Sequence, residues 1–173
     1  PPTAQDAIPE PGEPASGNLL LDRLFGAQIV WTQRAAREQT LKDTFQAAWD
    51  AGKRPYLIPY GGSNATGAAA YALAMQEFMS QGQPVDWMVF PSSSGGTQAG
   101  LALGARLAGF SGKVLGISVD EAADVLQKRV AGLANAAADL LGEKQAFQVE
   151  DILVNADYLG GGYGVMSALE RDA

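Results

Sequence analysis

Residues 89–100 hold the side chains best suited to binding a ligand. An apolar run is followed by a turn of three serines, two glycines and a threonine, and then by a stretch rich in Ala, Leu and Gly. This order predicts a strand, a tight loop and the N-terminus of a helix. The first N–H groups of a helix lack partners within it, and the helix dipole adds positive charge there. The loop at 92–97 therefore predicts an anion site, and a plain strand-to-helix turn explains its small residues equally well.

A second small-residue loop covers residues 61–67. Gly62 and Gly67 have the spacing of a P-loop, but Ala68 and Ala69 stand where that motif needs Lys and Ser or Thr. This departure excludes a P-loop nucleotide site. Neither loop carries the dinucleotide fingerprint, and no acidic residue stands at the expected strand end, which disfavours a Rossmann dehydrogenase.

A third loop, residues 160–164, contains Tyr163 among four glycines. It fits a turn whose tyrosine packs back on a sheet, and it also fits a phenol presented to a ligand. From the residues alone we favour the first interpretation.

The composition narrows the possible chemistry. The 173 residues contain no Cys and no His, so disulfides, thiolate or imidazole metal ligands, a cysteine nucleophile and a Ser-His-Asp triad are all excluded. We therefore expect no metal site. Chemistry at neutral pH would have to come from a cofactor or from lysine, tyrosine or carboxylate groups.

The charge narrows the possible partners. The formal net charge is −7 and the isoelectric point is near 4.5, without a basic cluster. An overall negative protein is repelled by phosphate backbones and anionic membranes, so we expect no nucleic-acid or membrane partner. No apolar run approaches a membrane span and no signal-peptide pattern stands at the N-terminus, which predicts a cytoplasmic protein.

Alternating helices and strands must position the three loops. The strands predict a three-layer α/β fold, with a mainly parallel sheet and helices on both faces. The ends of such strands share one edge, where ligands bind. Gly96, Gly100 and Gly104 lie on one helix face and predict close packing of helix on sheet. The predicted helices are 18–25, 38–50 (with Leu41, Phe45, Ala48 and Trp49 inward), 68–80, 98–108 and, capped by Asp120, about 121–141; the predicted strands are 28–31, 55–59, 85–90, 113–119 and 151–155.

Four segments, taken together in this order, resemble the D-cysteine desulfhydrase / 1-aminocyclopropane-1-carboxylate deaminase family. They are residues 17–27, 54–64, 94–101 and 162–165. Those proteins are pyridoxal-phosphate enzymes of the tryptophan-synthase β-type fold, fold type II. The resemblance implies a remnant of the small domain at 17–55 and part of the large cofactor-binding domain at 56–173. The proline-rich, poorly hydrophobic composition of residues 1–16 predicts a loop or disordered segment there.

The resemblance also implies roles for individual residues. Pyridoxal 5'-phosphate would be held by its phosphate, Tyr163 would lie beside substrate and cofactor, and Ser63 and Asn64 would lie at the rim of the substrate site. The substrate would be a small amino acid, with D-cysteine giving pyruvate, sulfide and ammonia favoured over 1-aminocyclopropane-1-carboxylate. A full-length relative would be a homodimer. The residues that would hold the phosphate are Ser93, Ser94, Gly95, Gly96 and Thr97.

One departure from the family pattern bears on activity. The family lysine that forms a Schiff base with the cofactor stands in a Gly-Gly-Asn-Lys context, which surrounds none of the five lysines here. We therefore predict a fragment that cannot bind the cofactor covalently by itself. Two alternatives stay open: a non-catalytic phosphate- or nucleotide-binding module, and a structural α/β domain without a ligand.

Overall fold

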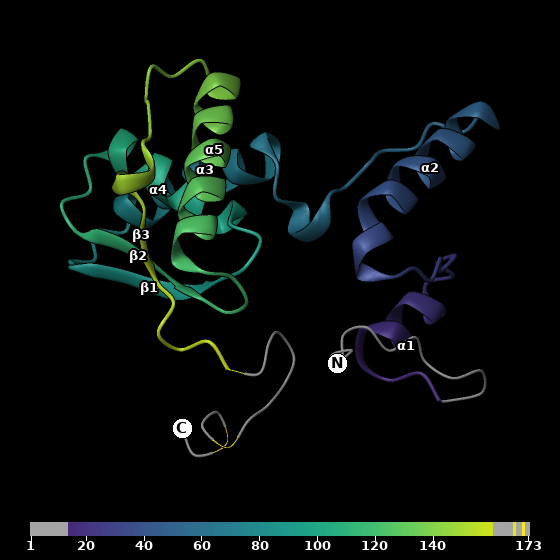
Figure 1. Cartoon of the computed structure of the whole chain (residues 1–173). Coiled ribbons are helices and arrows are strands. Elements are labelled where there is room, and N and C mark those ends of the chain that lie inside the picture. Colours follow the sequence, from purple (N-terminus) through teal and green to yellow (C-terminus); the bar gives the residue numbers. More distant parts are fainter. Residues whose placement is uncertain (1–13, 161–167, 169–170, 172–173) are drawn as a thin grey trace. The chain divides into compact units, whose positions relative to one another are not determined.

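The structure is a computed structural model that describes residues 14–160 together with Ala168 and Arg171 (Figure 1). The chain divides into two compact units, residues 1–57 and residues 58–173. The assignment of the two units to a small and a large domain stays a prediction.

The described residues of the first unit form two α-helices, α1 (Gly17–Leu24) and α2 (Arg37–Asp50), with a short 3-10 helix η2 (Arg34–Ala36) before α2. Both predicted helices are confirmed, but the strands predicted at 28–31 and 55–59 are wrong, since both segments are irregular. A strand needs a hydrogen-bonded neighbour, and the described part of this unit offers none. The residues predicted to face inward on α2 are not buried: Leu41 and Trp49 are exposed, and Trp49 stacks on Phe45 with 6.2 Å between ring centres.

The second unit begins with a 3-10 turn, η3 (Tyr60–Gly62), and then alternates helices and strands. Strands β1, β2 and β3 are parallel and adjacent in the order β1-β2-β3. In the register Val89 lies opposite Leu115, which lies opposite Leu153. The elements are α3 (Ala65–Ser80), β1 (Trp87–Ser92), α4 (Gly96–Ala108), β2 (Lys113–Ser118), α5 (Ala123–Leu141), η4 (Val149–Asp151) and β3 (Leu153–Asn155).

Helices α4 and α5 cover one face of this sheet. The crossovers through α4 and α5 step in the same direction along the strand order, and right-handed crossovers then place both helices on the same side (Figure 1). On the other side Trp87 and Val89 are 49% and 56% exposed and Leu153 is 38% exposed. The predicted α/β class and parallel sheet are confirmed, and a second helical layer is not among the described residues.

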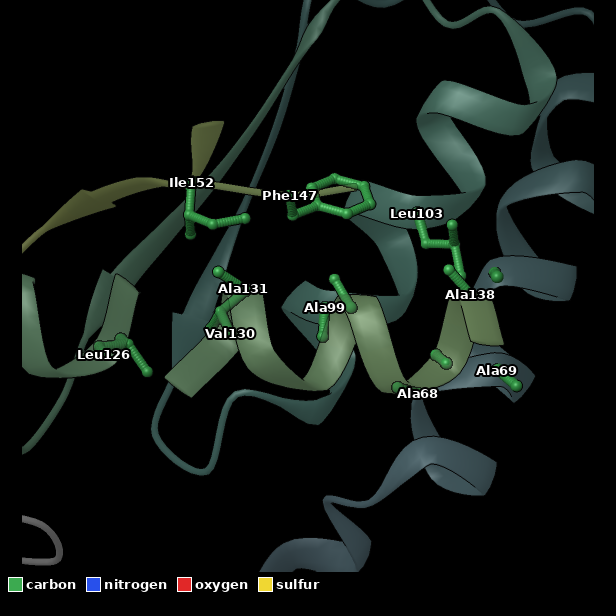
Figure 2. Close-up of a cluster of buried hydrophobic side chains, with 13 residues drawn as sticks. Ala68, Ala69, Ala99, Leu103, Leu126, Val130, Ala131, Ala138, Phe147 and Ile152 are labelled. Atoms are coloured by element: carbon green, nitrogen blue, oxygen red, sulfur yellow. The ribbon is translucent and has the colours of Figure 1, made fainter. Parts of the chain in front are cut away.

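The core of the second unit is built mainly from small side chains (Figure 2). Ala68 of α3, Ala99 and Leu103 of α4 and Val130 of α5 are fully buried. Figure 2 shows these side chains between the helices, with Phe147 and Ile152 toward β3. Alanines let the helix axes approach closely, so α3, α4 and α5 form one packed layer.

The glycine face of α4 packs differently from the prediction. A Cβ atom on Gly104 would lie 2.5 Å from Cβ of Met75, and one on Gly100 would meet Ala68 and Tyr71. These neighbours belong to α3, so the glycines permit a close helix–helix contact and the predicted helix–sheet contact is wrong. The four-residue spacing of these glycines identifies the crowded face of the helix, but not the element that packs against it.

No helix in the described ranges combines the length and the apolar character that a membrane crossing requires. Those same ranges contain no cluster of three or more acidic side chains arranged to hold a metal ion.

Candidate functional site

The loop after β1 lies at the carboxyl edge of the sheet, as predicted. Ser92 ends β1 opposite Ser118, the last residue of β2, so the turns after both strands share this edge. Gly95 is the N-cap of α4 and has φ +86°, a left-handed conformation that disfavours any residue with a side chain. A Cβ atom there would also lie 3.0 Å from Val130. The loop therefore needs glycine for its backbone and for its packing on α5.

Backbone donors and hydroxyls from two loops meet at the start of α4. The N–H of Gly96 donates to Oγ of Ser63 at 3.1 Å, and the Ser63 hydroxyl donates to Oγ of Ser94 at 2.8 Å. The helical hydrogen bonding starts only at the N–H of Ala99, which donates to the carbonyl of Gly95. The N–H of Gly96 thus already points at an oxygen, and the hydroxyl hydrogen of Ser94 remains able to donate to another acceptor.

The two loops approach too closely for larger residues. A Cβ atom on Gly96 would lie 2.6 Å from Ser63 Oγ, and one on Gly61 would lie 2.7 Å from Cβ of Ser94. Gly61 also has φ +66°. Glycine at both positions therefore lets the 61–64 segment lie against the N-terminus of α4.

Ser93 is tied to the segment that follows β2. Its hydroxyl donates to Oδ2 of Asp120 at 3.0 Å, and its carbonyl accepts from Nη1 of Arg129 at 3.0 Å. A hydroxyl carries one hydrogen, so in this geometry Ser93 can offer only its backbone N–H to an anion. Asp120 does not cap α5 as predicted, because the N-cap of that helix is Ala122, without a side-chain bond.

The remaining predicted residues divide into three cases. Ser63 lies against Ser94 and Gly96 of the 92–97 loop, and its predicted place at the substrate rim stays a prediction. Asn64 is the N-cap of α3, and its Oδ1 accepts the N–H of Gly67 at 2.8 Å, so this oxygen has a structural role. Tyr163 lies outside the described residues.

The lysines lie apart from these loops in sequence, and all five are exposed. Lys113, at the start of β2, pairs with Trp87 at the start of β1. It therefore lies at the N-terminal end of the strands, and Ser92 lies at their C-terminal end. Lys128 is on α5 and Lys144 follows the end of that helix. Among the described residues, the carboxyl groups with a lowered pKa also lie elsewhere. Lys42 lowers the pKa of Glu38, and the Gln148 N–H together with Arg106 lowers the pKa of Asp151.

The surroundings of the loop include residues that sequence reasoning missed. Arg129 binds the Ser93 carbonyl although it lies 36 positions further along the chain. Glu121 forms an ion pair with Arg129 at 2.8 Å. No local pattern marks an arginine on an amphipathic helix as a partner of a distant carbonyl. The acidic Asp120 next to a strand end was a visible signal, and helix capping was the wrong explanation for it.

Comparison with known proteins gives one consistent result. Residues 7–168 match a family model described as "Pyridoxal-phosphate dependent enzyme". The chain is 37% identical over 158 residues to a D-cysteine desulfhydrase of Klebsiella pneumoniae, covering 87% of this chain and 46% of the relative. It is 30% identical over 166 residues to a 1-aminocyclopropane-1-carboxylate deaminase of Methylobacterium nodulans, covering 91% and 49%.

A solved structure agrees with these sequences. The crystal structure of a protein described as an ACC deaminase homologue superposes with a TM-score of 0.67 at 28% identity, covering 83% of this chain and 45% of that one. The chain thus spans about half the length of the curated relatives it matches.

Proposed function

Because the chain belongs to the family of pyridoxal-phosphate dependent enzymes, we propose that the loop at 93–97 and the N-terminus of α4 hold the phosphate of pyridoxal 5'-phosphate. The family match confirms the cofactor and, with the solved structure, the fold type II class predicted from the sequence. The residues of the phosphate site and the reaction are the proposal.

The observation that carries the proposal is the N–H of Gly96 directed at an oxygen at the start of a 13-residue helix. A phosphate oxygen is a stronger acceptor than the Ser63 hydroxyl and is favoured by the helix dipole. Gly95 and Gly96 add no side chain of their own beside these donors, and Ser94 and Thr97 bring hydroxyls into the same turn. These groups fit a phosphate: the backbone of 94–97 binds it, and the Ser94 hydroxyl orients it.

The reaction that we propose for the complete enzyme is breakdown of a small amino acid. When bound, pyridoxal phosphate supplies an electron sink that permits loss of a proton and elimination of a neighbouring group. We favour D-cysteine desulfhydration to pyruvate, sulfide and ammonia, because the Gly-Gly-Ser-Asn form of residues 61–64 is closer to that branch. The alternative is 1-aminocyclopropane-1-carboxylate deamination, the activity named for other relatives. Tyr163 is proposed to lie beside the substrate.

We further propose that none of the five lysines binds the cofactor covalently. All are exposed, and none stands in the 60–64 or 93–97 segments. The test is to mix the protein with pyridoxal 5'-phosphate, reduce with borohydride and locate adducts by mass spectrometry. We expect no single lysine to be modified preferentially. A specific adduct on one lysine, with pyruvate release from D-cysteine, would overturn this part.

Phosphate binding is tested by titration with pyridoxal 5'-phosphate and with AMP. The expected result is saturable binding of pyridoxal phosphate, about two- to tenfold weaker in Ser94→Ala, the loss that corresponds to one hydrogen bond. Ser80→Ala, at the C-terminal end of α3, is the matched control and should bind as the unaltered protein does. Tighter binding of AMP would favour the nucleotide-binding alternative, and no binding of either compound would favour a structural domain.

For the complete enzyme, the two substrates are distinguished by product. Sulfide and pyruvate formed from D-cysteine would support desulfhydration. A 2-oxo acid and ammonia formed from 1-aminocyclopropane-1-carboxylate, without sulfide release from D-cysteine, would support the deaminase alternative.

A further inference from the structure

Arg129 of α5 contacts the proposed phosphate loop, residues 93–97, from the side of that helix. Its Nη1 donates to the carbonyl of Ser93 at 3.0 Å while its Nη2 donates to Oε1 of Glu121 at 2.8 Å. The two side chains are 37% and 29% exposed. A guanidinium is planar and carries its donors in a rigid fork, so engagement of both groups restricts its orientation.

The hydrogen bond from Arg129 to the Ser93 carbonyl sets the direction of a backbone N–H group. The C=O and N–H of one trans peptide unit point in opposite directions. With the Ser93 carbonyl directed at Arg129, the N–H of Ser94 in the same peptide unit points away from α5. That is the direction an anion donor needs, because α5 occupies the space on the carbonyl side.

Two further contacts hold the same assembly in place. The Ser93 hydroxyl donates to Asp120, so Ser93 is held through both its side chain and its backbone. The turn that carries Glu121 is closed by Ser118, whose Oγ accepts the N–H of Glu121 at 3.2 Å and donates to its carbonyl at 2.6 Å. Glu121 is therefore fixed before it pairs with Arg129.

We propose that Arg129, braced by Glu121, is a positioning residue of the phosphate site: it aims the Ser94 N–H through the Ser93 carbonyl. The inference rests on the proposed function, since it assumes that the loop binds a phosphate. It assigns Arg129 a role that its charge alone does not explain. A lysine would keep the charge but, as a single ammonium on a flexible stem, would not hold the carbonyl and the carboxylate in one fixed geometry.

The chain offers a matched control in Arg106 of α4. Arg106 likewise donates Nη1 to a backbone carbonyl, that of Ala146, and Nη2 to a carboxylate, that of Asp151 at 2.8 Å. Both partners lie in η4 or in the segment just before it, outside residues 93–97. Arg106→Lys thus disrupts an equivalent fork without touching Ser93.

The experiment compares Arg129→Lys with Arg106→Lys in ³¹P NMR titrations with inorganic phosphate and with pyridoxal 5'-phosphate, alongside thermal melting. Arg129→Lys should raise the Kd for both anions about two- to tenfold, the range of one lost hydrogen bond, and should speed hydrogen exchange of the Ser94 amide. Arg106→Lys should lower the melting temperature comparably and leave both Kd values unchanged.

The failures are distinguishable. Saturable binding that Arg129→Lys leaves at the unaltered affinity, or that Arg106→Lys weakens equally, would overturn the positioning role and spare the phosphate site. An unaltered protein that binds neither anion would overturn the proposed function and the inference with it.

Discussion

The hydroxyl oxygen of Ser63 accepts the backbone N–H of Gly96 at 3.1 Å, although the two residues are 33 positions apart. This bond joins the loop before α3 to the N-terminus of α4. It means that the first turn of α4 and the 61–64 segment form one structural unit at the carboxyl edge of the sheet.

Gly96→Ala should destabilise the protein by about 1–3 kcal/mol, the usual cost of forcing extra volume into a packed site. The added Cβ would lie 2.6 Å from Ser63 Oγ and 3.1 Å from its Cα. Urea unfolding measures the effect. Gly132→Ala is the control: a Cβ there meets nothing within 4 Å, so the better helix propensity of alanine should raise stability by up to about 1 kcal/mol. Equal effects of the two substitutions would contradict the close approach of the loops.

Asn64→Ala should cost about 0.5–2 kcal/mol of stability, because it removes the N-cap of α3 and leaves the Gly67 N–H unpaired. Asn64→Ser and Asn64→Asp should recover most of the loss, since both side chains can cap. Chemical unfolding of the three variants decides the question. A stability that stays at the unaltered level in Asn64→Ala would show that the cap is dispensable.

Gln98→Glu should be more destabilising than Gln98→Met. Gln98 is 1% exposed, and its Nε2 donates to the carbonyl of Leu153 at 2.7 Å, which connects α4 with β3. Glutamate places a charged acceptor against that carbonyl, while methionine removes the donor and the buried, unpaired Oε1 together. We expect a difference of at least about 1–2 kcal/mol, comparable with the cost of an unsatisfied buried polar group. Thermal unfolding at neutral pH that ranks the two variants in the reverse order would argue against the bond.

Acid should lower the stability of the folded protein partly by protonating Asp151. Its carboxylate accepts the N–H of Gln148 and then pairs with Arg106, and both contacts lower its pKa below the ordinary 3.8. A carboxyl pKa that is lower in the folded than in the unfolded state stabilises the fold above the unfolded pKa. That contribution disappears as the pH falls from about 3.8 through the folded pKa.

Unfolding midpoints across acid pH measure the effect of Asp151. Asp151→Asn should show a shallower loss of stability over this window than the unaltered protein. Arg106→Gln should be only partly shallower, because the backbone bond to Gln148 is the larger cause. Parallel acid profiles for Asp151→Asn and the unaltered protein would refute the assignment.

Sequence patterns located most elements of the second unit and fewer of the first. Apolar runs bounded by glycine or polar turns mark β1 and β2, and both strands lie where predicted to within two residues. The run at 55–59 has similar composition, but the described part of the chain places no strand beside it, so its backbone stays irregular. Strand formation depends on a partner, and composition reports only the capacity to pair. Helix prediction succeeded in both units because helical hydrogen bonds are local.

The sequence by itself determined the family, the cofactor and the kind of loop, because glycines, serines and a helix start in a fixed order are local features. Only the tertiary structure decided how that loop is held. It paired Ser93 with Asp120 and Arg129, turned Gly100 and Gly104 toward α3, and placed Ser63 against Gly96. The physical reason is that these contacts join residues about 30 positions apart. Their partners are selected by the packing of helices on one sheet, which no local pattern encodes.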